Sequence, residues 1–467
     1  MSRIAVIGAG VSGLATAYAL EQAAKAQNIE LQITVIEKQQ RSGGKIWSRH
    51  EEGYLCEWGP NGFLDNKPAT LELCKALTID DTLLRSNDNA RKRFIFSDNT
   101  LHRLPENGPM FLGSKLISWP GKFRLAGEMF VPAKRDDRDE TLAEFGRRRL
   151  GGEALDKLIA PMAGGIFAGD PETMSLKSCF PRIAELEQEY GGLLKAMIKM
   201  ARQKRAERKA GKQVASAAGP GGVLTSFNGG IQELTDALQE ALSADLRFGV
   251  SVESMAYFEN YILELSDGSQ LDVDAVVSAA PAYALAKICR NFNRNAVKLL
   301  EQIPYAPMNV VCLGYDKQTL KCDLNGFGYL IPKKEGCSVL GTLWDSSIFP
   351  YRAPEGKVLL RSMMGGATRP QAANLSDEQV QILVQADLER IMGIKATPEM
   401  ARIFRHERAI PQYVSGHAAL VKQIRSELTA TPRLFLTGNA YEGIGLNDCV
   451  ANANRTAAEV LKSLGHN

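Results

Sequence analysis

The order of hydrophobic and polar positions at the start of the chain predicts a strand, a helix and a second strand. The run RIAVIG at residues 3–8 is apolar and β-branched, which is typical of a buried parallel strand. Residues 14–27 have the composition of a helix, and LQITVIEK at residues 31–38 predicts a second strand that carries Glu37 near its end. The glycines after the first strand therefore lie at a strand-to-helix turn.

These glycines form a G-x-G-x-x-G pattern that favours dinucleotide binding. Gly8 permits a tight turn, Gly10 lets a pyrophosphate approach the backbone, and Gly13 lets the helix pack closely on the strand. Glu37 is placed to accept hydrogen bonds from a ribose, and NAD and FAD both fit this arrangement. The cofactor-binding residues predicted in this segment are Gly8, Gly10, Val11, Ser12, Gly13, Glu37 and Lys38.

The segment RSGGK, residues 41–45, distinguishes between these two cofactors. Gly43 and Gly44 allow the backbone to lie against a diphosphate, and Arg41 supplies a cation near the same charge. This Arg-x-Gly-Gly extension resembles the one that flavin oxidases of the amine oxidase superfamily carry after their glycine loop. The resemblance favours FAD and adds Arg41, Gly43, Gly44 and Lys45 to its predicted contacts.

The far end of the chain is consistent with a flavin. Residues 432–461 predict a strand that ends at Gly438, a glycine-containing loop and a helix. A helix N-terminus under the flavin ring would stabilise the negative charge that gathers on reduction. The predicted cofactor contacts here are Gly438 and Asn439, with Gly443, Ile444 and Gly445 as backbone donors to the ring.

The middle of the chain predicts a return to the nucleotide domain and two insertions. Residues 223–280 read as a helix followed by short strands. In flavin oxidases such a segment places one backbone against the adenine, which points to Val252, and brings Ala279 close to the cofactor. Helical patterns fill residues 90–222, and strands with helices between them fill residues 290–409.

The predicted fold class is therefore a multidomain α/β protein of the flavin amine oxidase type. Its Rossmann-like FAD-binding domain contains an inserted mixed-sheet substrate domain and a helical domain. The predicted boundaries are residues 1–70, 223–289 and 410–467 for the FAD-binding domain, 71–89 and 290–409 for the substrate domain, and 90–222 for the helical domain.

Composition narrows the classes of function. The 467 residues are 45% hydrophobic and 23% charged, which is typical of packed globular domains. A net charge of +3 argues against nucleic acid as a partner. The eight cysteines form no CxxC pair and no metal-like spacing, so we expect reduced thiols and no metal site. The chain enters its first strand within a few residues of Met1, so we expect a cytoplasmic protein without a signal peptide.

Four longer motifs carry a narrower resemblance. They are EWGPNGFLD at 57–65, PMAGGIFAGDPETMSLKSCFPRIAELEQEYGGLL at 161–194, GFGYLIP at 326–332 and GNAYEGIGLNDCV at 438–450. With them the chain resembles, essentially end to end, the oxygen-dependent protoporphyrinogen oxidases, an FAD-dependent porphyrinogen oxidase family of heme biosynthesis. The resemblance implies oxidation of protoporphyrinogen IX to protoporphyrin IX by non-covalent FAD, in three two-electron steps with O2 reduced to H2O2. Coproporphyrinogen III is the alternative substrate of the same chemistry.

The resemblance also implies a set of site residues. Arg93 in RKRFIF, residues 91–96, matches the arginine that holds a substrate propionate, and Arg91 could fill the same role. Asn61 is placed near the flavin and the reacting carbon, beside Gly59 and Pro60. The substrate ring is expected to contact Phe327, Gly328, Leu330, Phe349 and Met363.

Two segments suit a membrane surface. Residues 193–212 begin amphipathic and become strongly basic, and residues 109–123 mix large apolar side chains with lysine. The alternative for the first segment is a solvent-exposed helix end. The alternative for the second is a buried core segment followed by a loop. The partners that the resemblance allows are a porphyrinogen and O2, the inner face of the cell membrane, a second copy of the chain in a homodimer, and a ferrochelatase that takes over the product.

Two other classes of function share the fold. One is a different flavin oxidase, either an amine oxidase or a carotenoid desaturase; an amine oxidase often links its flavin through a cysteine, but Cys449 does not stand at the expected place. The other is a non-enzymatic module like the Rab GDP dissociation inhibitors. Such a module has no use for the complete pair RSGGK and GNAYEGIGLND, so the sequence favours an enzyme.

Overall fold

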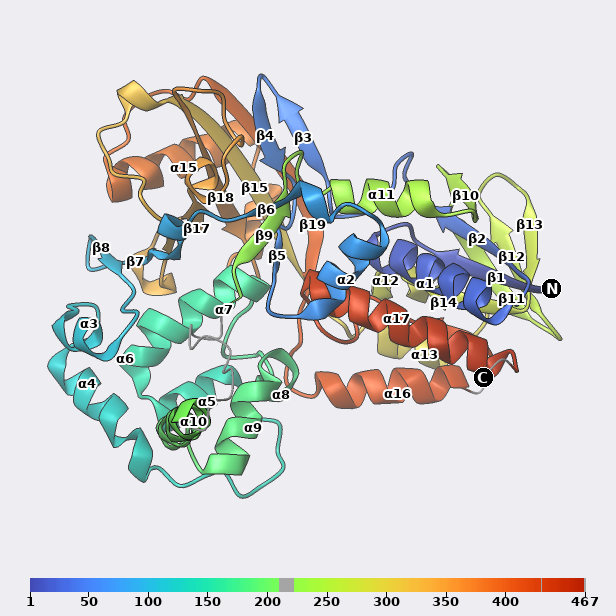
Figure 1. Ribbon diagram of the computed structural model, residues 1–467, viewed down its shortest axis with the longest axis horizontal. Helices are drawn as coiled ribbons and strands as arrows, with labels where there is room; N and C mark the ends of the chain where they lie inside the picture. Colours follow the sequence, from blue (N-terminus) through green and yellow to red (C-terminus); the bar gives the residue numbers. More distant parts are fainter. Residues whose placement is uncertain (210–221, 430, 466–467) are drawn as a thin grey trace. The chain divides into compact units, whose positions relative to one another are not determined.

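The computed structural model describes residues 1–209, 222–429 and 431–465, which pack into two compact units (Figure 1). The last residues of the predicted basic stretch 193–212, and residues 210–221 of the predicted helical domain, thus lie outside the described residues. The units are built from the described residues of Met1–Ser86, Gly222–Pro304 and Ala418–Asn467 (unit 1) and of Asn87–Gly221 and Tyr305–His417 (unit 2).

Unit 1 is organised around a parallel sheet with β1 (Ser2–Ile7) at its centre. β1 pairs with β2 (Leu31–Glu37) on one side and with β14 (Ala275–Ser278) on the other. Both neighbours are buried along most of their length, as the β-branched runs predict. The full order is β10 (Asp245–Phe248), β2, β1, β14 and β20 (Leu434–Leu436).

Two long helices pack together beside this sheet. α1 (Val11–Gln27) follows β1 and packs against α17 (Leu446–Ser463), so the two ends of the chain lie side by side in Figure 1. Their small buried residues, such as Ala15 and Ala453, permit the close approach. The remaining elements of unit 1 are α2 (Pro68–Ala76), α11 (Glu233–Ala241), α12 (Ala282–Ile288), α13 (Arg294–Leu300), α16 (His417–Thr429) and the small sheets β3 (Ser48–Glu51) with β4 (Tyr54–Glu57), β5 (Phe63–Leu64) with β9 (Leu224–Phe227) and β6 (Leu83–Arg85), and β11 (Val252–Tyr257) with β12 (Tyr261–Leu265) and β13 (Gln270–Val273).

Unit 2 contains a seven-stranded sheet in which distant parts of the sequence meet. The strands that form within residues 305–365, inside the predicted strand-and-helix segment 290–409, all lie in it. Residues 93–103, which fall in the predicted helical insertion, instead form a hairpin, and its first strand pairs in parallel with Gly328–Leu330. The order is β19 (Met400–Pro411), β15 (Tyr305–Asp316), β18 (Lys357–Gly365), β17 (Val339–Leu343), β16 (Gly328–Leu330), β7 (Arg93–Ser97) and β8 (Thr100–Arg103).

The predicted domain boundaries differ from these units at several points. Residues 290–304 belong to unit 1 instead of the substrate domain, and residues 410–417 belong to unit 2 instead of the FAD-binding domain. Residues 71–86 belong to unit 1 rather than to the segment 290–409, because α2 packs on α17 and β6 pairs with β9. The helical and mixed-sheet segments are two parts of one compact unit, since β7 and β8 complete the sheet from within the helical segment. The division into three domains therefore becomes a division into two units.

Helices occupy the rest of the first segment of unit 2. α7 (Ala160–Phe167) lies against the sheet at Gly165, where an added Cβ would come within 2.8 Å of Leu330 Cδ2. This glycine therefore lets the helix approach β16. The other elements of this segment are α3 (Gly108–Gly113), α4 (Trp119–Ala126), η3 (Gly127–Phe130), α5 (Leu142–Arg149), α6 (Gly152–Ala154), η4 (Leu155–Ile159), α8 (Leu176–Cys179), α9 (Pro181–Tyr190) and α10 (Leu193–Lys209). In the second segment of unit 2, α14 (Asp345–Ile348) lies between β17 and β18 in the sequence, and α15 (Asp377–Met392) lies between β18 and β19.

A buried ion-pair network ties these helices together. The fully buried Arg149 guanidinium contacts Glu128 Oε1 at 2.9 Å and Glu187 Oε1 at 3.0 Å. Glu128 in turn accepts hydrogen bonds from the backbone N–H groups of Leu193 and Leu194, at 2.8 and 3.0 Å. Arg149 on α5 thus fixes both η3 and the start of α10.

Replacing Arg149 with methionine should lower the free energy of unfolding by about 3–5 kcal/mol, because it leaves the buried Glu128 and Glu187 without this cation. Urea denaturation measures the loss. The control is Arg147→Met on the same helix, whose partner Glu172 is half exposed, so its cost should stay below about 1 kcal/mol. Equal effects of the two substitutions would contradict the structural role of Arg149.

Candidate active site

The first turn of unit 1 has the geometry that a dinucleotide requires. A Cβ at Gly13 would lie 1.8 Å from the Gly8 carbonyl oxygen, so α1 can start this close to β1 only with glycine at this position. The N-cap of α1 is Gly10, which has no side chain to cap the first N–H groups of the helix. These N–H groups and the helix dipole favour an anion at this end of α1.

Glu37 lies at the end of β2, where the sequence predicts it. Its Oε2 accepts a hydrogen bond from the backbone N–H of Ala9 at 2.9 Å, and its Oε1 accepts one from Gln39 at 2.9 Å. The side chain is buried, and Lys38 beside it is exposed. Each carboxylate oxygen keeps a second lone pair, so the predicted bond to a ribose stays sterically and chemically feasible.

The RSGGK loop lies directly on the glycine turn. Gly43 donates its N–H to the Ala9 carbonyl at 2.8 Å, and Gly10 and Gly43 form a parallel β-bridge. Gly43 has φ +92°, a conformation that favours glycine. The structure thus brings the two predicted phosphate-binding segments together in one backbone cradle.

Arg41 shapes this loop instead of presenting a free cation to the diphosphate. Its Nη1 donates to the Ser42 carbonyl at 2.8 Å and its Nη2 to the Gly44 carbonyl at 2.7 Å. The guanidinium also lies over the rings of Trp47, at 4.3 Å, and Trp58, at 5.0 Å. The sequence predicts the charge of Arg41 but not these partners. Through them the Arg41 side chain connects the RSGGK loop to the rings of Trp47 and Trp58.

Lys45 is the charged residue of this loop whose state is most sensitive to pH. Desolvation by burial lowers the pKa of its ammonium to about 8. The Lys45 carbonyl is close to Gly59, where an added Cβ would lie 2.3 Å from this oxygen. Gly59 therefore lies beside the RSGGK loop, and Pro60 and the buried Asn61 follow it along the chain.

We expect the affinity of the apoprotein for FAD to fall between pH 7 and 9, because Lys45 loses its positive charge as the pH rises through about 8. The fall should be about three- to tenfold, since one pKa unit corresponds to a factor of ten. Titration of flavin fluorescence measures it. Lys45→Met should bind FAD more weakly at pH 7 and show a flat profile; a sloping profile in this variant would assign the titration to another group.

The C-terminal segment meets the same turn. The structure ends β20 at Leu436, two residues before the predicted Gly438, and α17 begins at Leu446. A Cβ at Gly438 would lie 3.7 Å from Ser12 Oγ and 3.8 Å from the Ala279 carbonyl oxygen. The predicted contacts from the two ends of the chain and from β14 are thus neighbours in unit 1.

Two of the predicted contacts need correction. Gly445 already donates its backbone N–H to Asp448 Oδ2 at 3.2 Å. It could donate to a flavin only if this hydrogen bond broke, so the predicted donors are reduced to Gly443 and Ile444. Val252 begins β11 and pairs with Leu265, whereas the backbone alongside β2 is that of Val250, which donates its N–H to the Glu37 carbonyl at 3.0 Å. No signal in the sequence distinguishes these two valines.

Sequence reasoning also missed two buried hydroxyl groups at the ends of the strands. Ser278 ends β14 and Thr437 follows β20, and the Thr437 N–H donates to the Ser278 carbonyl at 3.0 Å. Within the described part of the chain, Ser278 Oγ and Thr437 Oγ1 have no hydrogen-bond partner. Buried hydroxyls without partners are costly. Together with the backbone cradle and Glu37, they fit a polar cofactor such as FAD in unit 1.

In unit 2 the predicted substrate residues Arg93, Phe327 and Gly328 lie on neighbouring strands. Gly328 is paired with Arg93 across β16 and β7, and the Arg93 guanidinium lies 5.0 Å from the Phe327 ring. No carboxylate of the described residues lies within 4.0 Å of Arg93, whereas Arg91 pairs with Asp88 at 3.2 Å. Arg93 is exposed at the start of β7, and partial desolvation lowers the pKa of its guanidinium. These features favour Arg93 over Arg91 as the anion-binding residue.

The other predicted wall residues differ in their exposure. Leu330 and Met363 are partly buried. Leu330 lies two residues after Gly328 on β16, and Gly328 is the residue that pairs with Arg93. Phe349 is wrong as a wall residue because it is completely buried, with the Arg352 guanidinium 5.1 Å from its ring. It follows α14 and packs as a core residue of unit 2.

Comparison with known proteins agrees with this geometry. Residues 11–461 match the family of flavin containing amine oxidoreductases. A coproporphyrinogen III oxidase of Bacillus subtilis (strain 168) is 31% identical over 99% of this chain and 98% of its own length. The chloroplastic protoporphyrinogen oxidase 1 of Arabidopsis thaliana is 30% identical over 97% of this chain and 87% of its own length. A crystal structure from Exiguobacterium sp. 255-15, provisionally named a protoporphyrinogen oxidase, has a TM-score of 0.84 at 26% identity and covers 100% of this chain and 99% of that one.

The chain therefore belongs to the family of flavin containing amine oxidoreductases. Within it, full-length relatives at 30–31% identity are named porphyrinogen oxidases, which confirms the resemblance drawn from the sequence motifs. The comparisons confirm the predicted fold class, the FAD cofactor and the assignment as a flavoprotein oxidoreductase. They favour an enzyme over the alternative of a non-enzymatic binding module.

Proposed function

We propose that the protein oxidises protoporphyrinogen IX to protoporphyrin IX with FAD as its electron acceptor and O2 as the final oxidant. The observation that carries the proposal is the Arg93 guanidinium beside the Phe327 ring, on a strand pair that continues into Leu330. A cation next to an apolar and aromatic surface suits a large ring with carboxylate arms. The names of the full-length relatives support the same substrate class.

The side chains bind and orient the substrate. When bound in unit 1, FAD would supply the two-electron redox chemistry of each step, with O2 as the final oxidant. Arg93 holds a propionate through a guanidinium that can bond both carboxylate oxygens, and Phe327 and Leu330 contact the ring. Asn61 is buried in unit 1, and its role in orienting the reacting carbon stays a prediction from the resemblance. No histidine is among the residues proposed for the site, so the pyrrole N–H protons would leave to water rather than to a strong base of the protein.

The choice between two porphyrinogens rests on the number of cations. Coproporphyrinogen III carries four propionates and calls for more positive groups than protoporphyrinogen IX, which carries two. The residues proposed for the wall include one cation, Arg93, which can bind one propionate of either porphyrinogen. The relatives include oxidases named for each substrate, so coproporphyrinogen III stays the alternative.

Anaerobic mixing of the FAD-loaded protein with each porphyrinogen tests the proposal. Bleaching of the flavin absorption and growth of the porphyrin spectrum are expected at matching rates, faster with protoporphyrinogen IX. Faster bleaching with coproporphyrinogen III would select the alternative. No bleaching with either would return the chain to the wider flavin oxidases, including the amine oxidases and carotenoid desaturases.

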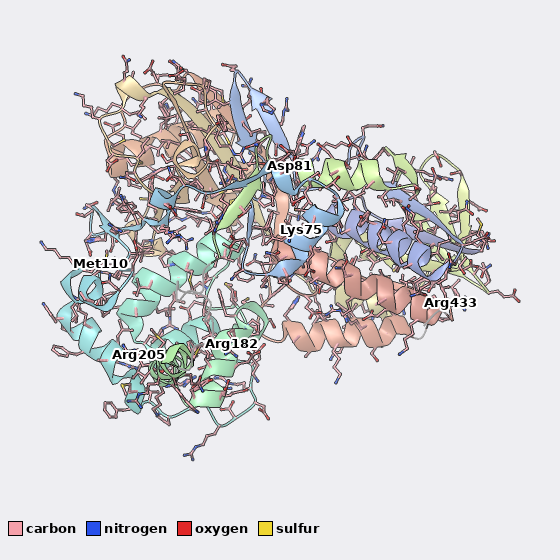
Figure 2. The ribbon with its side chains drawn as sticks, in the orientation of Figure 1. Lys75, Asp81, Met110, Arg182, Arg205 and Arg433 are labelled. Carbon is pink, nitrogen blue, oxygen red and sulfur yellow. The ribbon has the colours of Figure 1, made fainter. Side chains whose placement is uncertain are left out.

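We also infer contact with a membrane surface through one apolar face of unit 2. This face consists of Leu112, Trp119, Phe123 and Phe130, whose exposed fractions are 55%, 60%, 72% and 87%. Large exposed apolar groups beside a basic helix favour anionic lipid headgroups. The basic helix is α10, which packs on η3 and carries Arg205; Figure 2 labels this residue, and Met110 on α3, among these helices.

The structure organises this face from within. Lys122 Nζ donates to the carbonyls of Leu112 and Ser114, both at 2.7 Å, and lies 4.5 Å from the Trp119 ring. It thereby joins the end of α3 to α4. None of the described helices is long and apolar enough to cross a bilayer, so the contact proposed is peripheral.

Replacing both Trp119 and Phe123 with serine should weaken binding to phosphatidylglycerol vesicles by about 100-fold or more, because each large aromatic loses about 1.5–3 kcal/mol of apolar burial. Vesicle sedimentation measures the change. The control is the exposed Phe258 in unit 1, whose replacement by serine should leave binding unchanged. Equal binding of all three proteins would contradict the assignment of this face.

The remaining partner predictions come from the resemblance and are open to simple tests. Light scattering of the purified protein distinguishes a homodimer from a monomer. Transfer of the porphyrin to an added ferrochelatase, followed with a porphyrin-trapping competitor, tests the hand-off. Fractionation of cells tests the predicted cytoplasmic location at the inner face of the cell membrane.

A further inference from the structure

The apolar face of unit 2 is joined, through buried residues that pack together, to the strand that carries Arg93. Leu116 and Ile117 connect α3 to α4, and both are buried against Ile95 on β7. Leu330 on β16, a proposed wall residue, packs against the same cluster. Residues behind the exposed aromatic groups therefore touch the two strands that form the proposed substrate wall.

A second, polar connection joins the same elements. Lys157 on η4 is mostly buried and contacts Asp98 Oδ2 at 3.0 Å and Glu153 Oε1 at 3.4 Å. Asp98 lies in the turn between β7 and β8, and Glu153 accepts hydrogen bonds from the N–H and the hydroxyl of Ser118, at 3.0 and 2.6 Å. Ser118 caps α4, so the chain of contacts runs from the β7–β8 turn to the helix that carries Trp119.

We infer that docking of the apolar face on an anionic bilayer raises the affinity of the Arg93 wall for its substrate, through the contacts of Asp98, Lys157 and Glu153 and the apolar cluster beside them. This inference rests on the proposed function and on the proposed membrane contact. A bilayer that holds α4 in one position also restricts the β7–β8 hairpin, because Ser118, the N-cap of α4, is bound to Glu153, and Glu153 pairs with the Lys157 that holds Asp98. By linkage, bound substrate strengthens membrane binding by the same factor.

The test uses the full-length, FAD-loaded protein and vesicles with and without phosphatidylglycerol. In the wild type, anionic vesicles should lower the KM for porphyrinogen about fivefold and leave kcat within a factor of two. In Asp98→Asn, which removes the ion pair but keeps a side chain suited to the positive φ of +53°, sedimentation with vesicles should be unchanged and the KM shift should fall below a factor of two.

Two controls separate this effect from others. Asp136→Asn removes an equally exposed aspartate that pairs with Lys134 instead, and should keep the fivefold shift. The Trp119 and Phe123 double variant should bind vesicles about 100-fold more weakly, so a KM shift that it keeps at low vesicle concentration reports partition of the substrate into lipid. A shift in Asp98→Asn as large as in the wild type would overturn the inference, and so would a vesicle-bound wild type with an unchanged KM.

Hydrogen–deuterium exchange reports the connection without turnover. Vesicles should slow exchange in residues 93–103 of the wild type but not of Asp98→Asn. Equal slowing in both proteins, or slowing in neither, would overturn the inference. A protein that shows the expected exchange but oxidises no porphyrinogen would instead contradict the proposed function.

Discussion

Replacing Arg93 with alanine is expected to raise the KM for porphyrinogen by about 10- to 100-fold, because a hydrogen bond to a charged group is worth about 1.5–3 kcal/mol. The visible spectrum of bound FAD should stay unchanged, since the FAD contacts proposed here all lie in unit 1 and Arg93 lies in unit 2. Steady-state assays that follow porphyrin fluorescence measure the effect.

Arg91 provides the matched control for this substitution. It lies two residues away and pairs with the highly exposed Asp88, so Arg91→Ala should change the KM by less than about twofold. Arg93→Lys should fall between the wild type and the alanine variant, since lysine keeps the charge but cannot bind both carboxylate oxygens in the same plane. A normal KM in Arg93→Ala, or an equal rise in Arg91→Ala, would remove Arg93 from the site.

Replacing Gly13 with alanine is expected to abolish most FAD binding. The new Cβ would lie 1.8 Å from the Gly8 carbonyl oxygen and 3.0 Å from its carbon, and both are backbone atoms of the cradle. α1 must therefore move away from β1, which we expect to cost about 1–3 kcal/mol of stability and to weaken FAD binding by about 10- to 100-fold. Fluorescence titration of the apoprotein and urea denaturation measure the two losses.

Gly152→Ala is the control for an added methyl group. Nothing lies within 4 Å of a Cβ at this position, and the residue begins a short helix in unit 2. FAD affinity should therefore match that of the wild type. If Gly13→Ala bound FAD equally well, the close packing of α1 on β1 would not be needed for the cradle.

The features that could be predicted from the sequence depend on neighbouring residues. The first strand, the glycine turn, the helix and Glu37 follow one another within 37 residues, and local periodicity is enough to place them. The strand segments of 290–409 could be recognised for the same reason. Motif resemblance added the positions of Arg93, Phe327 and Gly328, which the structure indeed brings together.

The features that could not be predicted depend on long-range packing. The pairing of β7 with β16 joins residues more than 230 positions apart, so the strand at 93–97 looked like part of a helical insertion. Whether Phe349 faces a pocket or the core depends on which residues cover its ring. The Arg352 guanidinium covers it, and this contact depends on the folded structure. The bonds of Arg41 to loop carbonyls require the fold of the loop itself.

The most direct test of the central claim is an aerobic assay of the purified FAD-loaded protein with protoporphyrinogen IX and coproporphyrinogen III at matched concentrations. Porphyrin fluorescence and H2O2 are followed together and corrected for autoxidation in protein-free controls. The account predicts turnover well above the control, faster with protoporphyrinogen IX, with one H2O2 for each two-electron step. A protein with bound FAD that oxidises neither porphyrinogen faster than the control would contradict it.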